Sequence, residues 1–349
     1  MKAATRTDLR LMSRALEEAR RGVGRTSPNP PVGAVIAKNG RVLASGFHRA
    51  AGQPHAEIEA LKALSSPRQA VGATLYVSLE PCSTCGQTPA CTDAIIASGI
   101  KRVVYAMDDP NPSHAGRARR ILEKAGVEVS VGVCGEEAAK LLRPWTKFIL
   151  TGMPWVIAKA AMSLDGKISS HPEARWLTSP AARRDAMKLR ARVDAILIGA
   201  QTLRTDDPSL TLRGREVAAL PQPLRVVWSR SGDLPEGAKL FTDSQKDQTL
   251  VVRERSLRAV LKKLAGHGVV SVLIEGGGFT LGKAFDTRLV DEVCWYIAPD
   301  LLGGPTPAVG GRGVGSNAER ILLDAPHYEK IGRDLKITAR VQSSVPPCG

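Results

Sequence analysis

Short apolar runs typical of strands alternate with amphipathic helical runs along nearly the whole chain of 349 residues. In the first half, strand-like runs cover residues 73–82, 100–107 and 127–133, and helical runs separate them. Such alternation is typical of α/β domains, in which helices flank a mixed or parallel sheet. The pair Asn39-Gly40 between two apolar runs predicts a hairpin, which adds antiparallel strands to this sheet. We therefore expect an α/β fold.

The alternating pattern is interrupted once, near the middle of the chain. A helical segment is followed by Gly152 and Pro154, and a new β-rich run begins at Trp155. A chain of this length commonly folds as two domains. We therefore expect one domain over residues 1–149 and another over residues 150–349. Strands and helices alternate again after the interruption, so the second domain is also expected to be α/β.

Composition and charge exclude several classes of protein. Apolar residues make up 43% of the chain, which excludes a disordered protein. The N-terminal segment lacks the apolar core of a secretory signal, and no run approaches the roughly 20 apolar residues of a membrane span. We therefore expect a cytoplasmic protein that does not act on membranes. The net charge of +15 is spread over both halves without a basic tail, so a nucleic-acid-binding arm is not indicated. A basic surface also attracts small phosphorylated substrates, although a plain solvated surface has the same charge.

A cluster of cysteines in the first half has the spacing of metal ligands. The chain has six cysteines, and three of them fall in the stretch LEPCSTCGQTPAC at 79–91, which favours a metal site over disulfides. His55 lies upstream, at the start of a predicted helix. An imidazole and thiolates are ligands that Zn²⁺ prefers. The spacing leaves two ligand sets open, because either Cys85 or Cys91 can join His55 and Cys82.

A carboxylate next to the histidine gives this cluster a catalytic interpretation. Glu57 lies two residues after His55, and His-x-Glu followed by Pro-Cys is the signature of zinc deaminases. Three protein ligands leave one zinc position for a water, whose pKa falls to roughly 7. Glu57 can then carry a proton from this water to a leaving amine. The alternative is a structural zinc site, which gives Glu57 no role.

Further motifs occur in a fixed order over nearly the whole chain. They include GQPHAE at 52–57, LEPCS at 79–83, DPNP at 109–112, KAAMSLDGKI at 159–168 and TLRTDDPSLTLR at 202–213. Together they resemble the bifunctional riboflavin-biosynthesis deaminase/reductase family. The resemblance implies a cytidine-deaminase-like first domain with a mixed sheet flanked by helices. It implies a dihydrofolate-reductase-like α/β second domain.

The resemblance implies specific roles in the first domain. In the family, the third zinc ligand is the cysteine of a Thr-Pro-Pro-Cys motif, which corresponds to Cys91, so zinc is expected on His55, Cys82 and Cys91 with Glu57 as the catalytic residue. The expected reaction removes the 2-amino group of a diaminopyrimidinone that carries a ribosylamino 5′-phosphate. Asn29 is expected to hold the ribosyl part, although Asn between prolines is also a common turn residue.

Three positions depart from the family pattern. Thr84 stands where many members have His, Gln87 where they have Arg or Lys, and Ala174 where a Ser often contacts the reductase substrate. Gln87 is expected to hold a phosphate less tightly than a cation does, because charge-assisted hydrogen bonds are stronger.

For the second domain, the resemblance implies NADPH-dependent reduction of the ribosyl group to a ribityl group. The run SVLIEGGGFTLGKAF at 271–285 predicts a strand, a glycine turn and a helix, which allows backbone N–H groups to reach phosphates, although a plain tight turn has the same pattern. The expected cofactor contacts are Ala161, Trp176, Thr202, Asp206, Ser229, Gly277, Gly278, Phe279 and Thr280. The expected substrate contacts are Lys159, Arg190, Leu210, Arg213 and Glu275, of which the two arginines suit a phosphate.

The family commonly forms dimers or tetramers, so a homo-oligomer is expected. The main alternative is a zinc deaminase of nucleosides or nucleic acid, whose second domain is unrelated or has lost its function. The net charge favours this alternative, whereas an aromatic content of 4% disfavours it, because binding of single strands depends on stacking.

Overall fold

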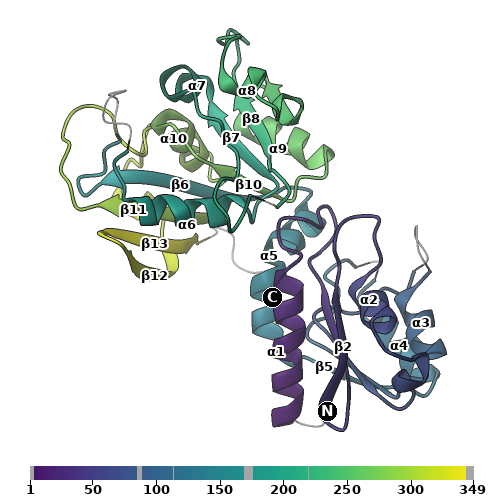
Figure 1. The fold of residues 1–349 in the computed structure, drawn as a ribbon. Coiled ribbons are helices and arrows are strands. Elements are labelled where there is room, and N and C mark those ends of the chain that lie inside the picture. Colours follow the sequence, from purple (N-terminus) through teal and green to yellow (C-terminus); the bar gives the residue numbers. More distant parts are fainter. Residues whose placement is uncertain (1–3, 85–88, 113, 169–175, 219, 343–349) are drawn as a thin grey trace. The chain divides into compact units, whose positions relative to one another are not determined.

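The structure is a computed structural model, and it describes residues 4–84, 89–112, 114–168, 176–218 and 220–342. The chain divides into two compact units, Met1–Gly152 and Met153–Gly349. Each unit is built on its own sheet (Figure 1). In the described part of the chain, no helix combines the length and the apolar character needed to cross a membrane.

The first unit is built on a mixed sheet, as expected. Its described residues form five strands in the order β2-β1-β3-β4-β5, with β1 antiparallel to both neighbours and β3, β4 and β5 parallel. The strands are β1 (Gly33–Lys38), β2 (Arg41–Phe47), β3 (Thr74–Val77), β4 (Arg102–Tyr105) and β5 (Glu128–Val131). The helices are α1 (Arg6–Arg20), α2 (Ala56–Lys62), α3 (Cys91–Ala97), α4 (Arg117–Lys124), α5 (Gly135–Thr151) and the 3₁₀ helix η1 (Pro67–Ala70).

Helices cover both faces of this sheet. Helices α1 and α5 lie side by side on one face, while α2, α3 and α4 lie together on the other (Figure 1). Leu11 and Leu16 of α1 pack in one core cluster with Val35, Tyr76 and Val104 of the sheet. The opposite face, under α2 and α3, carries the predicted metal ligands.

Two local features bring α2 against the sheet. The predicted hairpin is confirmed: Asn39 and Gly40 have φ of 50° and 75°, and Lys38 pairs with Arg41 across the turn. In β2, a Cβ added to Gly46 would lie 2.5 Å from the backbone nitrogen of Ala60. Only glycine therefore lets α2 approach β2 this closely.

The second unit is also α/β, as expected. Its described residues form eight strands in the order β12-β13-β11-β6-β10-β7-β8-β9, which are parallel from β11 to β9 and antiparallel where β13 pairs with β11 and β12. The strands are β6 (Trp155–Ser163), β7 (Ala195–Gly199), β8 (Leu224–Trp228), β9 (Thr249–Val252), β10 (Ser271–Ile274), β11 (Glu292–Ala298), β12 (Leu323–Ile331) and β13 (Asp334–Val341).

Helices bury both faces of this second sheet. Leu261 of α9 and Leu281 of α10 belong to one core cluster, and Leu189 of α6 and Leu240 of α8 belong to another. The strands β7 and β10 are buried throughout, as expected for parallel strands covered on both faces. The helices are α6 (Pro180–Arg190), α7 (Ala200–Asp206), α8 (Lys239–Thr242), α9 (Leu257–Gly266), α10 (Gly278–Asp286) and the 3₁₀ helices η3 (Lys246–Gln248) and η4 (Asn317–Glu319).

Candidate active sites of the two units

In the first unit, His55, Cys82 and Cys91 form the metal-binding cluster that the family pattern predicted. Their ligand atoms all lie within 4.8 Å of one another, and each sulfur is 3.4 Å from His55 Nδ1. His55 is the N-cap of α2, Cys91 is the first residue of α3, and Cys82 lies between β3 and α3. Cys85, the competing ligand, lies outside the described residues.

The chemistry of these donors fits a doubly charged cation. A hydrogen bond with the Cys91 thiol lowers the pKa of Cys82 to about 4, against the effect of burial, and the His55 ring acts in the same direction. The pKa of Cys91 is raised, because the Cys82 thiolate beside it and burial both oppose a second negative charge. A dication between the sulfurs would stabilise both thiolates. One imidazole and two thiolates therefore suit Zn²⁺ with one coordination position left open.

Glu57 lies in the first turn of α2 and is buried, with 3% of its surface exposed. Burial, together with the nearby Cys82 thiolate, raises the pKa of Glu57 to about 7. A carboxyl group with a pKa near neutral can both accept and release a proton at physiological pH. The structure thus places an acid–base group beside the metal-binding cluster.

Asn29 lies against a histidine that the sequence analysis did not select. Asn29 Nδ2 is 3.1 Å from His48 Nε2, and His48 Nδ1 is 3.1 Å from the carbonyl oxygen of Pro54. Because that carbonyl only accepts, Nδ1 carries the proton and Nε2 accepts from Asn29. The ring of His48 also packs edge-on against His55, with centroids 5.3 Å apart. The motif GFH at 46–48 was the signal that could have identified His48.

Glu80 holds the loop that contains the DPNP motif. Its carboxylate accepts hydrogen bonds from the backbone N–H groups of Asp109, Gly116 and Ala118, at 3.1, 2.9 and 2.9 Å. Glu80 is itself buried and lies two residues before Cys82, so the loop is anchored next to a metal ligand. Of the three departures from the family pattern, Thr84 is exposed, and Gln87 and Ala174 lie outside the described residues.

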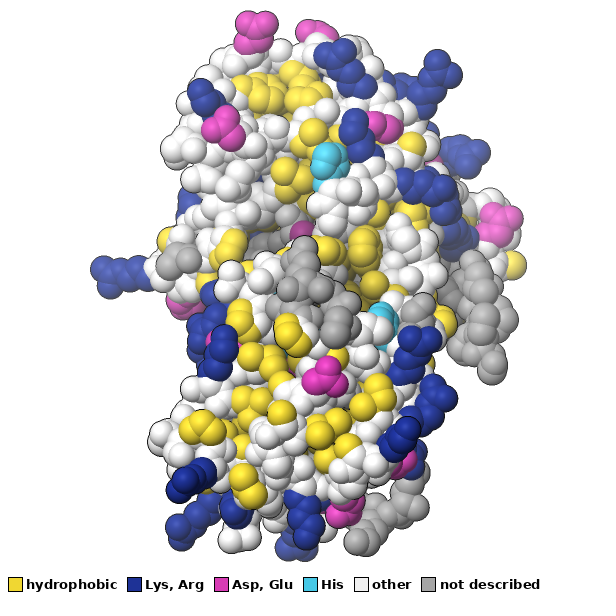
Figure 2. Space-filling model, turned by 90° about the vertical axis from the view of Figure 1, so that its right-hand side faces the viewer, with side chains coloured by type: hydrophobic (Ala, Val, Ile, Leu, Met, Phe, Trp, Pro, Cys, Tyr) yellow, Lys and Arg dark blue, Asp and Glu magenta, His cyan; other side chains and the backbone are white. Residues whose placement is uncertain are grey.

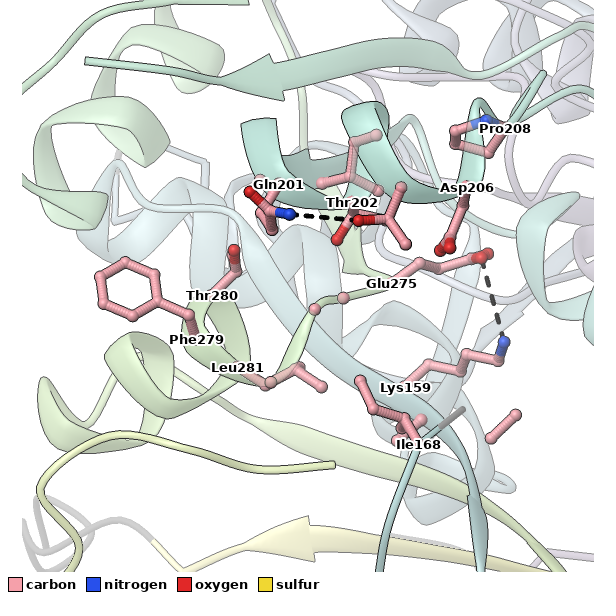
Figure 3. Close-up of a pocket in the computed structure, with 18 of the residues that line it drawn as sticks. Lys159, Ile168, Gln201, Thr202, Asp206, Pro208, Glu275, Phe279, Thr280 and Leu281 are labelled. Carbon is pink, nitrogen blue, oxygen red and sulfur yellow. Dashed lines mark hydrogen bonds and ion pairs between the residues drawn. The ribbon is translucent and has the colours of Figure 1, made fainter. Parts of the chain in front are cut away.

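The second unit contains a cavity of about 2440 Å³ at the carboxyl ends of its parallel strands. Figure 3 shows part of its wall, with Lys159 and Glu275 facing each other and Thr202 and Thr280 on neighbouring elements. Trp176 lies at the rim and is 57% exposed, so it is not a core residue. Every cofactor or substrate contact expected in the second half lines this cavity: Lys159, Ala161, Trp176, Arg190, Thr202, Asp206, Leu210, Arg213, Ser229, Glu275, Gly277, Gly278, Phe279 and Thr280.

The glycine turn forms one wall of this cavity, at the start of α10. Gly276 has φ of 128°, a conformation that side chains rarely adopt. A Cβ added to Gly278 would lie 2.2 Å from the carbonyl oxygen of Pro307, so glycine is required there by close packing. Helix α10 has no acidic residue in its first turn, and the N–H groups of this turn suit an anionic ligand.

A buried ion pair lies deeper in the cavity. Arg190 donates from Nε and Nη2 to the two carboxylate oxygens of Glu275 at 2.6 and 2.8 Å, and from Nη1 to the carbonyl of Thr211. The nitrogen of Lys159 is 3.9 Å from the same carboxylate. From the sequence, the guanidinium of Arg190 suits a phosphate. In the structure, its Nε and Nη2 groups are instead hydrogen-bonded to Glu275. Arg190 is itself buried.

This pair makes the stability of the second unit depend on pH. Burial acts to raise the pKa of Glu275, but Arg190 and Lys159 outweigh it and lower the pKa from 4.5 to about 2. Such a shift contributes about 3 kcal/mol, present above pH 4.5 and lost as the pH falls towards 2. Glu275→Gln leaves Arg190 unpaired, and we expect it to cost about 3–5 kcal/mol at pH 7. This difference from the wild type should shrink below pH 4.5.

Urea unfolding followed by tryptophan fluorescence measures this difference, because four of the five tryptophans lie in the second unit. Glu216→Gln is the matched control, since Glu216 pairs with Lys188 in a solvated position and should contribute little to stability. A stability difference for Glu275→Gln that stays constant from pH 7 to pH 3 would contradict the argument.

Comparison with known proteins matches each unit to a family whose description fits the site found there. Residues 5–107 match the cytidine and deoxycytidylate deaminase zinc-binding region, and residues 154–337 match the RibD C-terminal domain. The riboflavin biosynthesis protein RibD of Bacillus amyloliquefaciens is 39% identical over 360 residues, covering 94% of this chain and 95% of that protein. RibD of Escherichia coli is 40% identical over 323 residues, covering 84% and 88%.

Solved structures of similar proteins share this fold over nearly the whole chain. RibD of Acinetobacter baumannii superimposes with a TM-score of 0.88 at 35% identity, covering 97% of this chain and 99% of that one. A protein of Thermotoga maritima, described as a diaminohydroxyphosphoribosylaminopyrimidine deaminase/5-amino-6-(5-phosphoribosylamino)uracil reductase, has a TM-score of 0.86 at 32% identity, covering 96% and 99%.

A zinc-binding deaminase unit joined to a reductase unit defines the class of bifunctional pyrimidine deaminase–reductases. The predicted fold classes of both units are thereby confirmed. Within this class, the chain belongs to the RibD family of riboflavin biosynthesis.

Proposed function

We propose that the chain catalyses two successive reactions on one phosphorylated pyrimidine. The first is hydrolytic deamination of 2,5-diamino-6-ribosylamino-4(3H)-pyrimidinone 5′-phosphate. The second is NADPH-dependent reduction of the ribosyl group of the product to a ribityl group. The observation that carries this proposal is the presence, in one chain, of a buried Glu57 beside the His55, Cys82 and Cys91 cluster and of a Lys159–Glu275 cavity with a glycine turn.

In the first unit, the residues of the chain bind the substrate and move protons. Zinc, when bound, supplies a water acidic enough to act as a nucleophile near neutral pH. The carboxylate of Glu57 takes a proton from the nucleophile and returns it to the amine, which leaves as ammonia. Asn29, which is hydrogen-bonded to His48, binds the ribosyl part. Glu80 fixes the adjoining loop through three backbone hydrogen bonds.

In the second unit, NADPH, when bound, would supply the hydride for the imine carbon of the ring-opened sugar, and the imine nitrogen would take a proton from water. Glu275 stays ionised at neutral pH, because its pKa is about 2, so its role is to hold Lys159 and not to donate a proton. Arg190 in turn holds Glu275 in a fixed orientation. We assign the substrate phosphate to Arg213, which lines the same cavity.

The partner of this protein is then a small phosphorylated molecule. On the face shown in Figure 2, Lys and Arg side chains are spread over the surface and are not gathered in one patch. This supports a small anionic substrate over a nucleic acid strand, and we expect no membrane partner. We also propose a cytoplasmic location and a homo-oligomeric state, in line with the expectation from the family resemblance.

The decisive experiment follows both reactions in one sample of the zinc-loaded, full-length protein. We expect ammonia release from the diaminopyrimidinone phosphate, followed by NADPH oxidation that requires the deaminated product. Ammonia release without NADPH oxidation would refute the second activity. Deamination of cytidine or single-stranded DNA in place of this substrate, with salt-sensitive binding, would favour the nucleic-acid alternative.

A further inference from the structure

Tyr296 is a buried tyrosine beside Lys159 in the second unit, and it was not among the expected contacts. Tyr296 of β11 pairs with Ala161 of β6, two residues after Lys159, and with Lys336 of β13. Because side chains alternate between the two faces of a strand, Lys159, Tyr296 and Lys336 lie on the same face of the sheet. Helix α6 covers this face, since Tyr296 packs in one core cluster with Ala186 of α6.

Asp185 of α6 fixes the ring of Tyr296. The phenol O–H donates to Asp185 Oδ2 at 2.6 Å, and Lys336 Nζ lies 2.6 Å from the same oxygen. Burial raises the pKa of Tyr296, so the phenol keeps its proton and remains a donor. Burial acts to raise the pKa of Asp185, but the hydrogen bonds from Lys336 and Tyr296 outweigh it and lower the pKa, so Asp185 remains a carboxylate. With 1% of its surface exposed, Tyr296 is both packed and tethered.

The ring of Tyr296 faces the ammonium group of Lys159. Lys159 Nζ lies over the ring, 5.9 Å from its centroid, and 3.9 Å from a carboxylate oxygen of Glu275. The side chain of Lys159 is 16% exposed, and the attraction between an ammonium and an aromatic face grows as water is excluded. Lys336 lies 5.8 Å from the same centroid, but its charge is already paired with Asp185. Lys159 is therefore held by a carboxylate and by an aromatic ring.

Helix α6 supports both of these contacts. Arg190 fixes Glu275 through two hydrogen bonds, and Asp185 on the same helix fixes Tyr296. Lysine has a long, flexible side chain that loses rotamer freedom when it is held, so a second contact narrows the range of positions that Lys159 samples. Tyr296 also lines the cavity itself. A side chain that only filled the core would need neither the carboxylate partner nor the contact with Lys159.

We propose that Tyr296, with its hydroxyl held by Asp185, is a positioning residue that keeps the ammonium of Lys159 beside Glu275, where the substrate binds. This inference rests on the proposed reductase function, in which Lys159 contacts the pyrimidine substrate. The aromatic ring makes the contact with Lys159, so phenylalanine should replace Tyr296 better than an aliphatic residue does.

Calorimetric binding of the deaminated pyrimidine phosphate to the full-length protein tests the proposal. We expect Tyr296→Leu to raise the dissociation constant about tenfold and to lower kcat/KM of the reduction to a similar extent, because no ring holds Lys159. Tyr296→Phe keeps the ring and should stay within about threefold of wild type. Trp295→Leu is the matched control and should stay within about twofold, because Trp295 lies on the same strand but packs against the other core cluster and Phe285.

A double variant separates the contact with Lys159 from a general effect on the fold. In a Lys159→Met background, Tyr296→Leu should not raise the dissociation constant further, because the ammonium is already absent. Full additivity of the two changes, or a Tyr296→Phe variant as impaired as Tyr296→Leu, would overturn the proposal. If Tyr296→Leu does not fold, Tyr296→Met takes its place, since methionine fills irregular gaps in a core without offering an aromatic face.

Chemical labelling of Lys159 keeps the test independent of the substrate. Under limited acetylation followed by mass spectrometry, Lys159 should react about threefold faster in Tyr296→Leu than in wild type, because the aromatic face no longer stabilises its charged form. Its rate in Tyr296→Phe and Trp295→Leu should equal that of wild type, with exposed Lys101 of the first unit as the internal reference. Unchanged labelling in Tyr296→Leu would contradict the contact. A wild-type protein that does not oxidise NADPH refutes the reductase function, and the labelling result then decides on Tyr296 separately.

Discussion

Replacing Glu57 with glutamine is expected to lower the rate of ammonia release by roughly a hundredfold to ten-thousandfold. Glutamine has the same shape as glutamate and still forms hydrogen bonds, but it cannot take up a proton from the nucleophile. Glu57 is buried beside the metal ligands, where its carboxyl interacts with Cys91. NADPH oxidation with deaminated substrate should be unchanged, because Glu57 belongs to the first unit.

The measurement combines ammonia release with metal analysis of the same protein sample. The variant should keep one zinc per chain, since Glu57 is not one of the three ligands. Glu59→Gln is the matched control, because Glu59 lies on the same helix but forms a surface pair with Arg49. A Glu57→Gln enzyme with bound zinc and wild-type deamination would show that the metal is structural.

Cys91→Ser should remove the zinc, whereas Cys85→Ser should keep it. A serine hydroxyl is not deprotonated like a thiol and is a poor ligand for Zn²⁺. The first unit should also lose thermal stability, because a metal that binds only the folded state adds about 4 kcal/mol when its free concentration is a thousandfold above the dissociation constant. Zinc content after dialysis against a chelator, together with thermal unfolding, measures both effects.

The pair of variants also separates the two ligand sets that the spacing left open. Loss of zinc from Cys85→Ser together with retention in Cys91→Ser would overturn the assignment to His55, Cys82 and Cys91. Cys134→Ser is a suitable control, because Cys134 lies at the N-cap of α5 and is not part of the cluster. Its zinc content and deamination rate should equal those of the wild type.

Local signals explain why several elements could be predicted. The Asn39-Gly40 hairpin depends on two residues that adopt positive φ, so its turn is a property of the segment itself. The glycine turn after β10 is a similar case, because Gly276 adopts a conformation that other residues avoid. The antiparallel strands β12 and β13 at the end of the chain were not predicted. β12 is largely exposed, so it lacks the buried apolar run that marked the other strands.

The metal site was predictable only in part. His55 and Glu57 are close in sequence, so a single helix start places both. Cys91 reaches His55 across 36 residues, and spacing alone could not choose it over Cys85. The choice came from the family pattern, and the packing of α3 beside α2 then brings Cys91 to the cluster.

The amino-acid sequence by itself determined the alternation of strands and helices, the turns and the types of residue available for chemistry, because these depend on neighbours within a few positions. Only the tertiary structure decided which of these residues meet. Arg190 and Glu275 pair across 85 residues, and the Arg253 guanidinium lies against Gly232 because β8 and β9 are neighbours in the sheet. Such contacts depend on the order of strands, which is set by the packing of both sheet faces and not by any local segment.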